Sequence, residues 1–175
     1  HEALPFCRRA VELDSDNPMF QIQLGQILAR MERVGEAIAA FQRAVDLDPN
    51  LSSAHFSLGV AFREQGRIDD AVAEYGKAVT LDPKNVRAGN NLGNALQVMG
   101  RLDDAVLAYR KALEAAPNDA LTLKNFGVSL DRVGRSRESL AALRKANEAA
   151  SSADGTPPEG VQESVNAVEK RVVFE

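Results

Sequence analysis

The sequence predicts an all-α protein: an α-solenoid of stacked antiparallel helix pairs, closed at its C-terminal end by a capping helix. Three observations support this prediction. A 34-residue unit recurs without a gap, and the stretch from Ser52 to Asn85 is its clearest copy. Each unit holds two segments with helical hydrophobic spacing, and in most units a Gly separates them. A Pro follows the second segment in three of the four units, where it stops a helix. The period is therefore that of a helical hairpin.

Side-chain columns recur at this spacing, and each has a physical role. The first segment carries an apolar residue followed by Gly, which lets the second helix approach closely. The second segment carries a large residue between two small ones, the alternation that interdigitated packing needs. The apolar-Gly dipeptides are Leu24-Gly25, Leu58-Gly59, Leu92-Gly93 and Phe126-Gly127, and the large residues are Phe41, Tyr75, Tyr109 and Leu143.

In chain order, residues 1–17 fit the second half of a preceding unit, in which Cys7 takes the place of the large residue. Free cysteine is usually a small buried hydrophobe, and we expect that role here in preference to a redox role. Later turns carry a Gly that suits a positive φ, as at Gly66. Because Glu32 fills that slot in the first turn, we expect this turn to differ in shape. The predicted helices of the four full units span 18–31, 35–47, 52–65, 69–81, 86–99, 103–115, 120–133 and 137–150.

The last part of the chain departs from the pattern. The fourth unit has Ser136 and Ser139 at packing positions and Ser151 in place of Pro, so we expect it to be loosely packed. The run SSADGTPP that follows has the composition of a flexible linker. Beyond it, Val161 and three later valines recur at helical spacing, which predicts a capping helix that covers the last unit. The alternative is a tethered ligand helix that occupies a groove in its own or another molecule.

Composition and charge exclude several classes of protein. The formal net charge is −4, with 21 Lys and Arg against 25 Asp and Glu, which argues against general affinity for nucleic acid or anionic membranes. Cys7 is the sole cysteine, so neither an intrachain disulfide nor a cysteine-based zinc site is possible. The sequence shows no secretory signal and no apolar run that could span a membrane. The chain starts inside a helix, so we interpret it as an excised fragment, and we expect a cytoplasmic location.

These columns resemble those of the tetratricopeptide repeat family. The likeness rests on the Leu-Gly dipeptide, the Gly-Arg-hydrophobic-Asp-Asp-Ala runs at 66–71 and 100–105, and the Leu-Asp-Pro endings at 47–49 and 81–83. It implies a right-handed superhelix whose concave face is lined by the first helix of each unit, and a protein that binds peptides or proteins without catalysis. The implied boundaries are an array over 1–153, with a half repeat at 1–17 and full repeats at 18–51, 52–85, 86–119 and 120–153, and a linker with capping helix at 154–175.

The resemblance places a partner-binding surface on this concave face. The amides on it both donate and accept, so they can bond a peptide backbone whatever its sequence. Five basic residues face two acidic ones there, which favours an acidic or carboxylate-bearing segment. A solvated helix face with scattered amides and charges remains the alternative. The predicted binding residues are Gln23, Gln26, Arg30, Phe56, Arg63, Arg87, Asn90, Asn91, Asn94, Lys124, Asn125 and Arg132.

Other functions are disfavoured or left open. The Lys, Asn, Asn, Lys, Arg pattern of the chaperone-binding branch is absent, so we expect no such carboxylate clamp. We expect no catalysis, metal or cofactor, because no HExxH, Walker or GxGxxG motif occurs and His55 lies in an aromatic packing column. Homo-oligomeric assembly is the main alternative, since the run 134–148 is similar to the last repeat of magnetosome-associated proteins. A third is the repeat region of a larger enzyme such as a glycosyltransferase, because the inner Asn row is similar to that of O-GlcNAc transferases.

Overall fold

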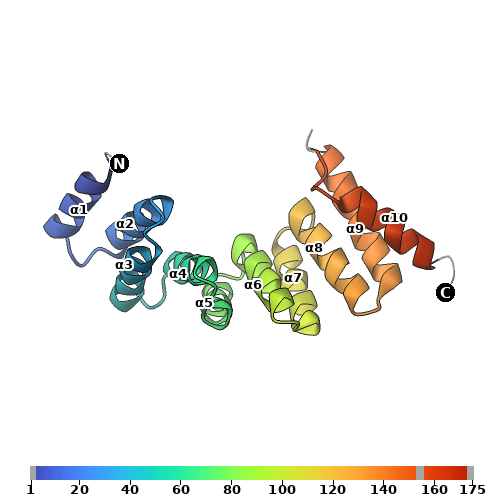
Figure 1. Cartoon of the computed structure of the whole chain (residues 1–175), viewed down its shortest axis with the longest axis horizontal. Helices are drawn as coiled ribbons and strands as arrows, with labels where there is room; N and C mark the ends of the chain where they lie inside the picture. Colours follow the sequence, from blue (N-terminus) through green and yellow to red (C-terminus); the bar gives the residue numbers. More distant parts are fainter. Residues whose placement is uncertain (1–2, 153–155, 173–175) are drawn as a thin grey trace. The chain divides into compact units, whose positions relative to one another are not determined.

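A computed structural model describes residues 3–152 and 156–172. Within these residues every regular element is an α-helix, as the sequence predicts. The chain divides into two compact units, residues 1–82 and 83–175, and helical hairpins build both of them (Figure 1).

The first unit holds a single helix followed by two hairpins. Each hairpin packs its second helix against its first, and α3 also packs against α4. The large residues of the repeat, such as Phe41 and Tyr75, are buried in this core together with the flanking alanines. The helices are α1 (Ala3–Leu13), α2 (Pro18–Arg30), α3 (Val34–Leu47), α4 (Ser52–Glu64) and α5 (Ile68–Leu81).

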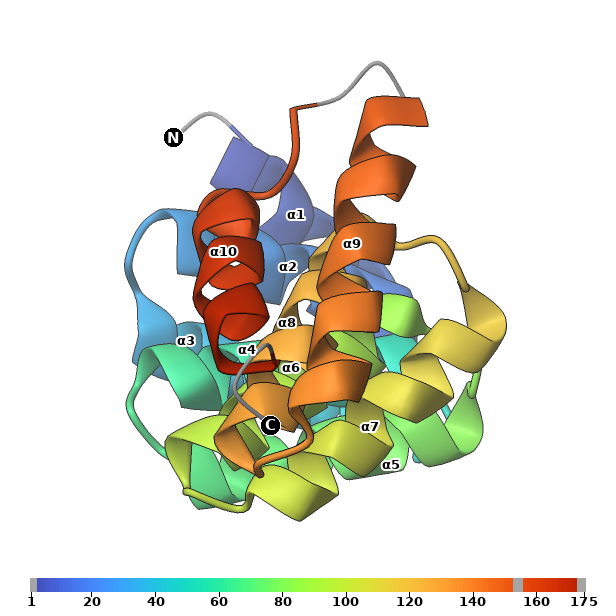
Figure 2. The same ribbon diagram turned by 90° about the vertical axis from the view of Figure 1, so that its right-hand side faces the viewer.

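The second unit holds two hairpins and a last helix. This last helix, α10, packs against α9 and also touches α8 (Figure 2). Its valines Val161, Val165 and Val168 are buried in one cluster with Leu123 and Leu143. The helices are α6 (Val86–Val98), α7 (Leu102–Ala115), α8 (Ala120–Arg132), α9 (Ser136–Ser152) and α10 (Val161–Val172).

The four turns inside the hairpins share one conformation, which corrects the prediction for the first of them. Gly66 has φ 78°, and Glu32 at the equivalent position has φ 59°. The hydrogen bonds also match, since the N–H of Glu32 donates to Ala29 and that of Gly66 to Arg63, both at 2.9 Å. The hairpin geometry imposes the left-handed conformation whatever the side chain, so Glu32 carries a strain that a Gly avoids.

The fourth unit is closely packed, so the prediction of loose packing is wrong. Ser139 is fully buried, and its hydroxyl donates to the carbonyl oxygen of Gly127 at 2.8 Å. Leu143 is also fully buried, and a Cβ added at Gly127 would lie 2.7 Å from its Cγ. The serine therefore replaces a small apolar residue without loss of contact, because its one polar group finds an acceptor across the hairpin.

Each second helix of the full units begins with an ion pair that the sequence analysis did not foresee. An Arg directly before the helix binds an acidic side chain three residues later, in the first turn, where an acidic group also meets the positive end of the helix dipole. These pairs are exposed, so each contributes little to stability. They are Arg33–Glu36, Arg67–Asp70, Arg101–Asp104 and Arg135–Glu138.

Candidate functional site

The predicted binding residues of the first unit lie on α2 and α4 and differ in accessibility. Gln23, Gln26 and Arg30 are exposed on α2, and Arg63 is exposed on α4. Phe56 is partly buried instead, with its ring centroid 6.0 Å from that of Tyr75. This aromatic residue therefore supports the hairpin core as well as bordering the surface.

In the second unit, hydrogen bonds tie the predicted amides into the fold. Asn125 Nδ2 donates to Asn90 Oδ1 at 3.0 Å, which links α8 to α6. The hydroxyl of Tyr109 on α7 donates to Asn94 Oδ1 at 2.7 Å. These bonds fix the orientation of the two amides. Asn94 is left with its NH₂ group, and Asn125 with its Oδ1, for further bonding.

Accessibility within this row is uneven. Asn90 is buried, 7% exposed, so it acts inside the fold as the acceptor for Asn125. Asn91, Asn94, Asn125 and Lys124 are partly buried. Arg87 and Arg132 are exposed at the two ends of the row, on α6 and α8.

Gln97 on α6, a further amide that the resemblance places on the concave face, extends this network. Its Nε2 donates to Ser129 Oγ on α8 and lies 3.4 Å from the carbonyl oxygen of Asn125. Ser129 is fully buried. The signal in the sequence was Ser129, which stands in a column that holds Ile27, Ala61 and Ala95 in the other units.

The charges on this face of α8 are partly neutralised by α10. Asp131 Oδ2 accepts a hydrogen bond from Arg171 Nη2 at 2.7 Å. Lys124 and Arg132 form no ion pair within residues 3–152 and 156–172. The second unit therefore presents basic groups in this row whose counter-charge is not supplied by the described chain.

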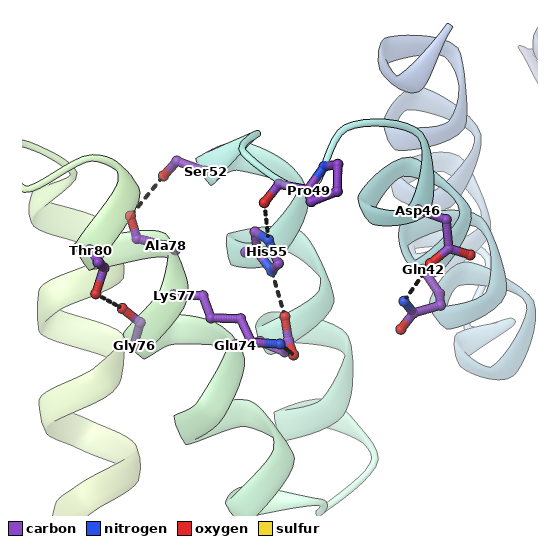
Figure 3. A network of polar contacts seen from close by, with 10 residues as sticks. All are labelled: Gln42, Asp46, Pro49, Ser52, His55, Glu74, Gly76, Lys77, Ala78 and Thr80. Atoms are coloured by element: carbon purple, nitrogen blue, oxygen red, sulfur yellow. Dashed lines mark hydrogen bonds and ion pairs between the residues drawn. The ribbon is translucent and has the colours of Figure 1, made fainter. Parts of the chain in front are cut away.

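A second polar cluster lies inside the first unit, around His55 (Figure 3). Its ring is buried, 3% exposed, as expected for a packing column. Nδ1 lies 2.6 Å from Glu74 Oε2, and Nε2 lies 2.9 Å from the carbonyl oxygen of Pro49. Glu74 Oε1 accepts from Lys77 Nζ at 2.7 Å. Because all these polar atoms already have partners, the cluster joins helices and offers no open ligand site.

This cluster was not predicted, although the repeat columns of the sequence hold a signal for it. Glu74 stands in a column that is otherwise small and apolar, with Ala40, Ala108 and Ala142. A lone buried carboxyl in such a column needs a partner, and His55 is the ionisable residue of the same unit in the facing column.

Among the described residues, open grooves lie beside the second helices of the hairpins. One of about 570 Å³ runs between α3 and α5 with His55 on its floor. Another of about 570 Å³ runs between α7 and α9 with Leu123 and Phe126 on its floor. Several of the residues that line the two grooves occupy equivalent positions two repeats apart, so both grooves are a consequence of the regular hairpin spacing.

Metal clusters, membrane-spanning helices and reactive thiols are features of other functional classes. Among the described residues, no group of three or more His, Cys, Asp or Glu side chains is placed to hold a metal ion. The helices of the same residues include none both long and apolar enough to cross a bilayer. Cys7 is a free thiol and is partly buried on α1.

The fold and the first-helix rows together define a helical-repeat scaffold. The tetratricopeptide repeat model matches residues 22–86 and 56–120, which together cover more than half of the chain. The chain belongs to the tetratricopeptide repeat family.

Solved structures of other proteins share this fold. The chain is similar to a crystal structure of MamA, with 23% identity, a TM-score of 0.77, and coverage of 84% of this chain and 86% of that one. MamA from Desulfovibrio magneticus RS-1 gives 22% identity, a TM-score of 0.77, and coverage of 88% and 87%. PilF from Pseudomonas aeruginosa gives 21% identity, a TM-score of 0.74, and coverage of 90% and 69%. No curated protein sequence matches the chain.

Proposed function

We propose that this chain is a protein-interaction scaffold that binds an extended, acidic peptide segment along the first helices of its repeats. The observation that supports this most directly is the row on α6 and α8. There Asn94 and Asn125 are oriented by internal hydrogen bonds, and Lys124 lies beside them without an ion pair in the described chain.

The amides account for the extended backbone of the ligand. Asn94 offers N–H donors and Asn125 offers a carbonyl acceptor, the two functions that a peptide bond requires. Because internal bonds already hold both side chains, little rotamer entropy is lost when a ligand binds.

The basic groups account for the acidic character of the ligand. Long-range attraction to carboxylates raises the association rate and selects against basic segments. The protein as a whole carries a net charge of −4, so this preference is a property of the row and not of the chain.

A binding experiment with charge-matched probes tests this function. Fluorescein-labelled hexaglutamate should bind more tightly than hexaglutamine, and the preference should shrink as salt screens it. The double variant Arg87→Glu/Lys124→Glu should abolish the preference. The control Lys111→Glu/Arg137→Glu makes the same charge change on exposed second-helix positions and should retain most of it. Equal loss in both variants, or equal binding of the two peptides, would refute the proposal.

Self-assembly is a second candidate, supported by an apolar face on α1. Phe6 and Leu13 lie seven residues apart on one side of this helix and are 78% and 73% exposed. Exposed apolar side chains of this size on one face are typical of interaction surfaces.

Light scattering over a concentration series separates the two candidates. If the chain self-assembles, the average molar mass in solution should rise with protein concentration, and Phe6→Ser/Leu13→Ser should prevent the rise. A peptide receptor should remain monomeric in the absence of ligand at every concentration.

A further inference from the structure

We propose that α10 forms one wall of the binding row on α8, and that Arg171 determines the preference of this row for acidic segments. This inference rests on the proposed function and adds a specificity-determining residue to it. It differs from a purely structural capping role in that a side chain of α10 acts on the ligand-facing charges of α8.

The side chains of α10 border the same face of α8 that carries the predicted binding residues. Lys124, Val128 and Arg132 follow one another at four-residue steps, so they lie on one face of α8. A cavity of about 130 Å³ is lined by Val128, Asp131 and Arg132 from α8, and by Ser164, Ala167 and Arg171 from α10. A segment lying along this face of α8 would therefore meet α10 at its end.

Arg171 removes the one negative charge from the binding face of α8. The Asp131 side chain is 17% exposed, and Arg171 Nη2 donates to its Oδ2 at 2.7 Å. Without that partner, the Asp131 carboxylate would oppose Lys124 and Arg132 and would repel an acidic ligand. When Arg171 is bound to Asp131, Lys124 and Arg132 set the net charge of this face.

The buried half of Asp131 does not serve a ligand. Its Oδ1 is buried and has no hydrogen-bond partner within the described residues, so a peptide N–H does not reach it. Arg132 is exposed on α8 beside the neutralised carboxylate, and a guanidinium binds carboxylates through charge-assisted hydrogen bonds. The chemistry points to an acidic side chain as the group bound at this end of the row.

Charge variants of the full chain test the proposal with the hexaglutamate and hexaglutamine probes. Arg171→Gln should weaken hexaglutamate binding by about threefold to tenfold at low ionic strength, because it exposes the charge of Asp131. Asp131→Asn should strengthen it by a similar factor. The double variant Asp131→Asn/Arg171→Gln should return to wild-type affinity, since the two charge changes cancel.

A matched control separates electrostatics from the docking of α10. Arg144 on α9 donates to Glu169 of α10 at 2.7 Å, so Arg144→Gln removes an ion pair of equal length that also holds this helix. Arg144→Gln should leave hexaglutamate affinity unchanged. If it weakens binding as much as Arg171→Gln, or if the double variant stays weak, α10 acts only as a cap and the inference is overturned. If the wild-type chain binds both peptides equally, the proposed function fails as well.

Discussion

Nδ1 of His55 lies 2.6 Å from Oε2 of Glu74, and Nε2 of the same ring lies 2.9 Å from the carbonyl oxygen of Pro49. The carbonyl oxygen can only accept, so Nε2 carries a hydrogen. One imidazole therefore connects the end of one hairpin to the second helix of the next, at a position where the other units use uncharged residues.

Removing one member of this pair should destabilise the protein more than removing both. Glu74→Ala leaves the buried His55 Nδ1 without its partner, so we expect a loss of about 2–4 kcal/mol in the free energy of unfolding. His55→Leu/Glu74→Ala reproduces the pair Leu123 and Ala142 of the fourth unit and should stay within about 1 kcal/mol of wild type. Urea denaturation followed by circular dichroism measures both. A double variant as unstable as the single one would contradict this account.

The close contact at Gly59 should not tolerate a side chain. A Cβ added there would lie 2.7 Å from Cδ1 of the fully buried Tyr75. We expect Gly59→Ala to cost about 1–3 kcal/mol in the free energy of unfolding, and Gly59→Leu to cost at least as much. Gly76→Ala is the control, because nothing lies within 4 Å of its added Cβ. That variant should gain about 0.5–1 kcal/mol, since alanine favours a helix interior.

Replacing Glu32 by Gly should stabilise the first hairpin. Glu32 has φ 59°, a conformation that costs an L-residue free energy and costs a Gly almost none. After the larger entropy loss of Gly is subtracted, we expect a net gain of about 0.5–1 kcal/mol. The reverse change, Gly66→Ala, should lose about 1 kcal/mol. Thermal unfolding measures both changes, and a destabilised Glu32→Gly variant would mean that the carboxylate makes a contribution of its own.

Thr122→Val should increase stability. The Thr122 side chain is fully buried, and within the described chain its Oγ1 has no hydrogen-bond partner. A methyl group of the same shape removes the cost of the unsatisfied hydroxyl, so we expect a gain of about 1 kcal/mol. Thr80→Val is the control, because that hydroxyl is exposed and donates to the Gly76 carbonyl oxygen at 2.9 Å. Its effect should stay within about 0.5 kcal/mol.

Acid should weaken the ion pairs that precede the second helices. The hydrogen bonds from Arg33 hold the pKa of Glu36 below its usual 4.5, and those from Arg135 do the same for the pKa of Glu138. A lowered folded-state pKa means that the stabilisation is present above 4.5 and is lost as pH falls through the folded value. The urea concentration at the midpoint of unfolding should therefore fall less between about pH 6 and pH 3 in Glu36→Gln/Glu138→Gln than in wild type. A fall as large in this variant as in wild type would contradict the account.

The helical architecture could be predicted because it depends on local and periodic signals. The starts and ends of the eight helices in the full units agree with the predicted ones to within about two residues. The prediction for Glu32 failed because residue preference is a weak guide where the hairpin imposes the backbone angle. The prediction for Ser139 failed because its acceptor, the Gly127 carbonyl oxygen, lies on the other helix of the hairpin.

The candidate site could be predicted only in part. The helical period placed Lys124, Asn125 and Arg132 on one helix, and the structure agrees on that placement. The helical period could not indicate that Asn125 is bonded to Asn90. That hydrogen bond depends on how side chains of two different helices are oriented, and the two residues are 35 positions apart in the sequence. Nor could the helical period indicate that Arg171, 40 residues after Asp131, neutralises the carboxylate of that row.

The sequence by itself determined the repeat, its hairpins and the glycine contacts, because each of these follows from spacing along one or two helices. The tertiary structure decided which polar atoms are already used and which remain for a partner. Asn94 and Asn125 are examples, since each has one side-chain atom bonded internally and another left over. The reason is physical: packing in a helical hairpin is set by side-chain volume at regular intervals, whereas hydrogen bonds and charge pairs require specific atoms to meet at specific distances.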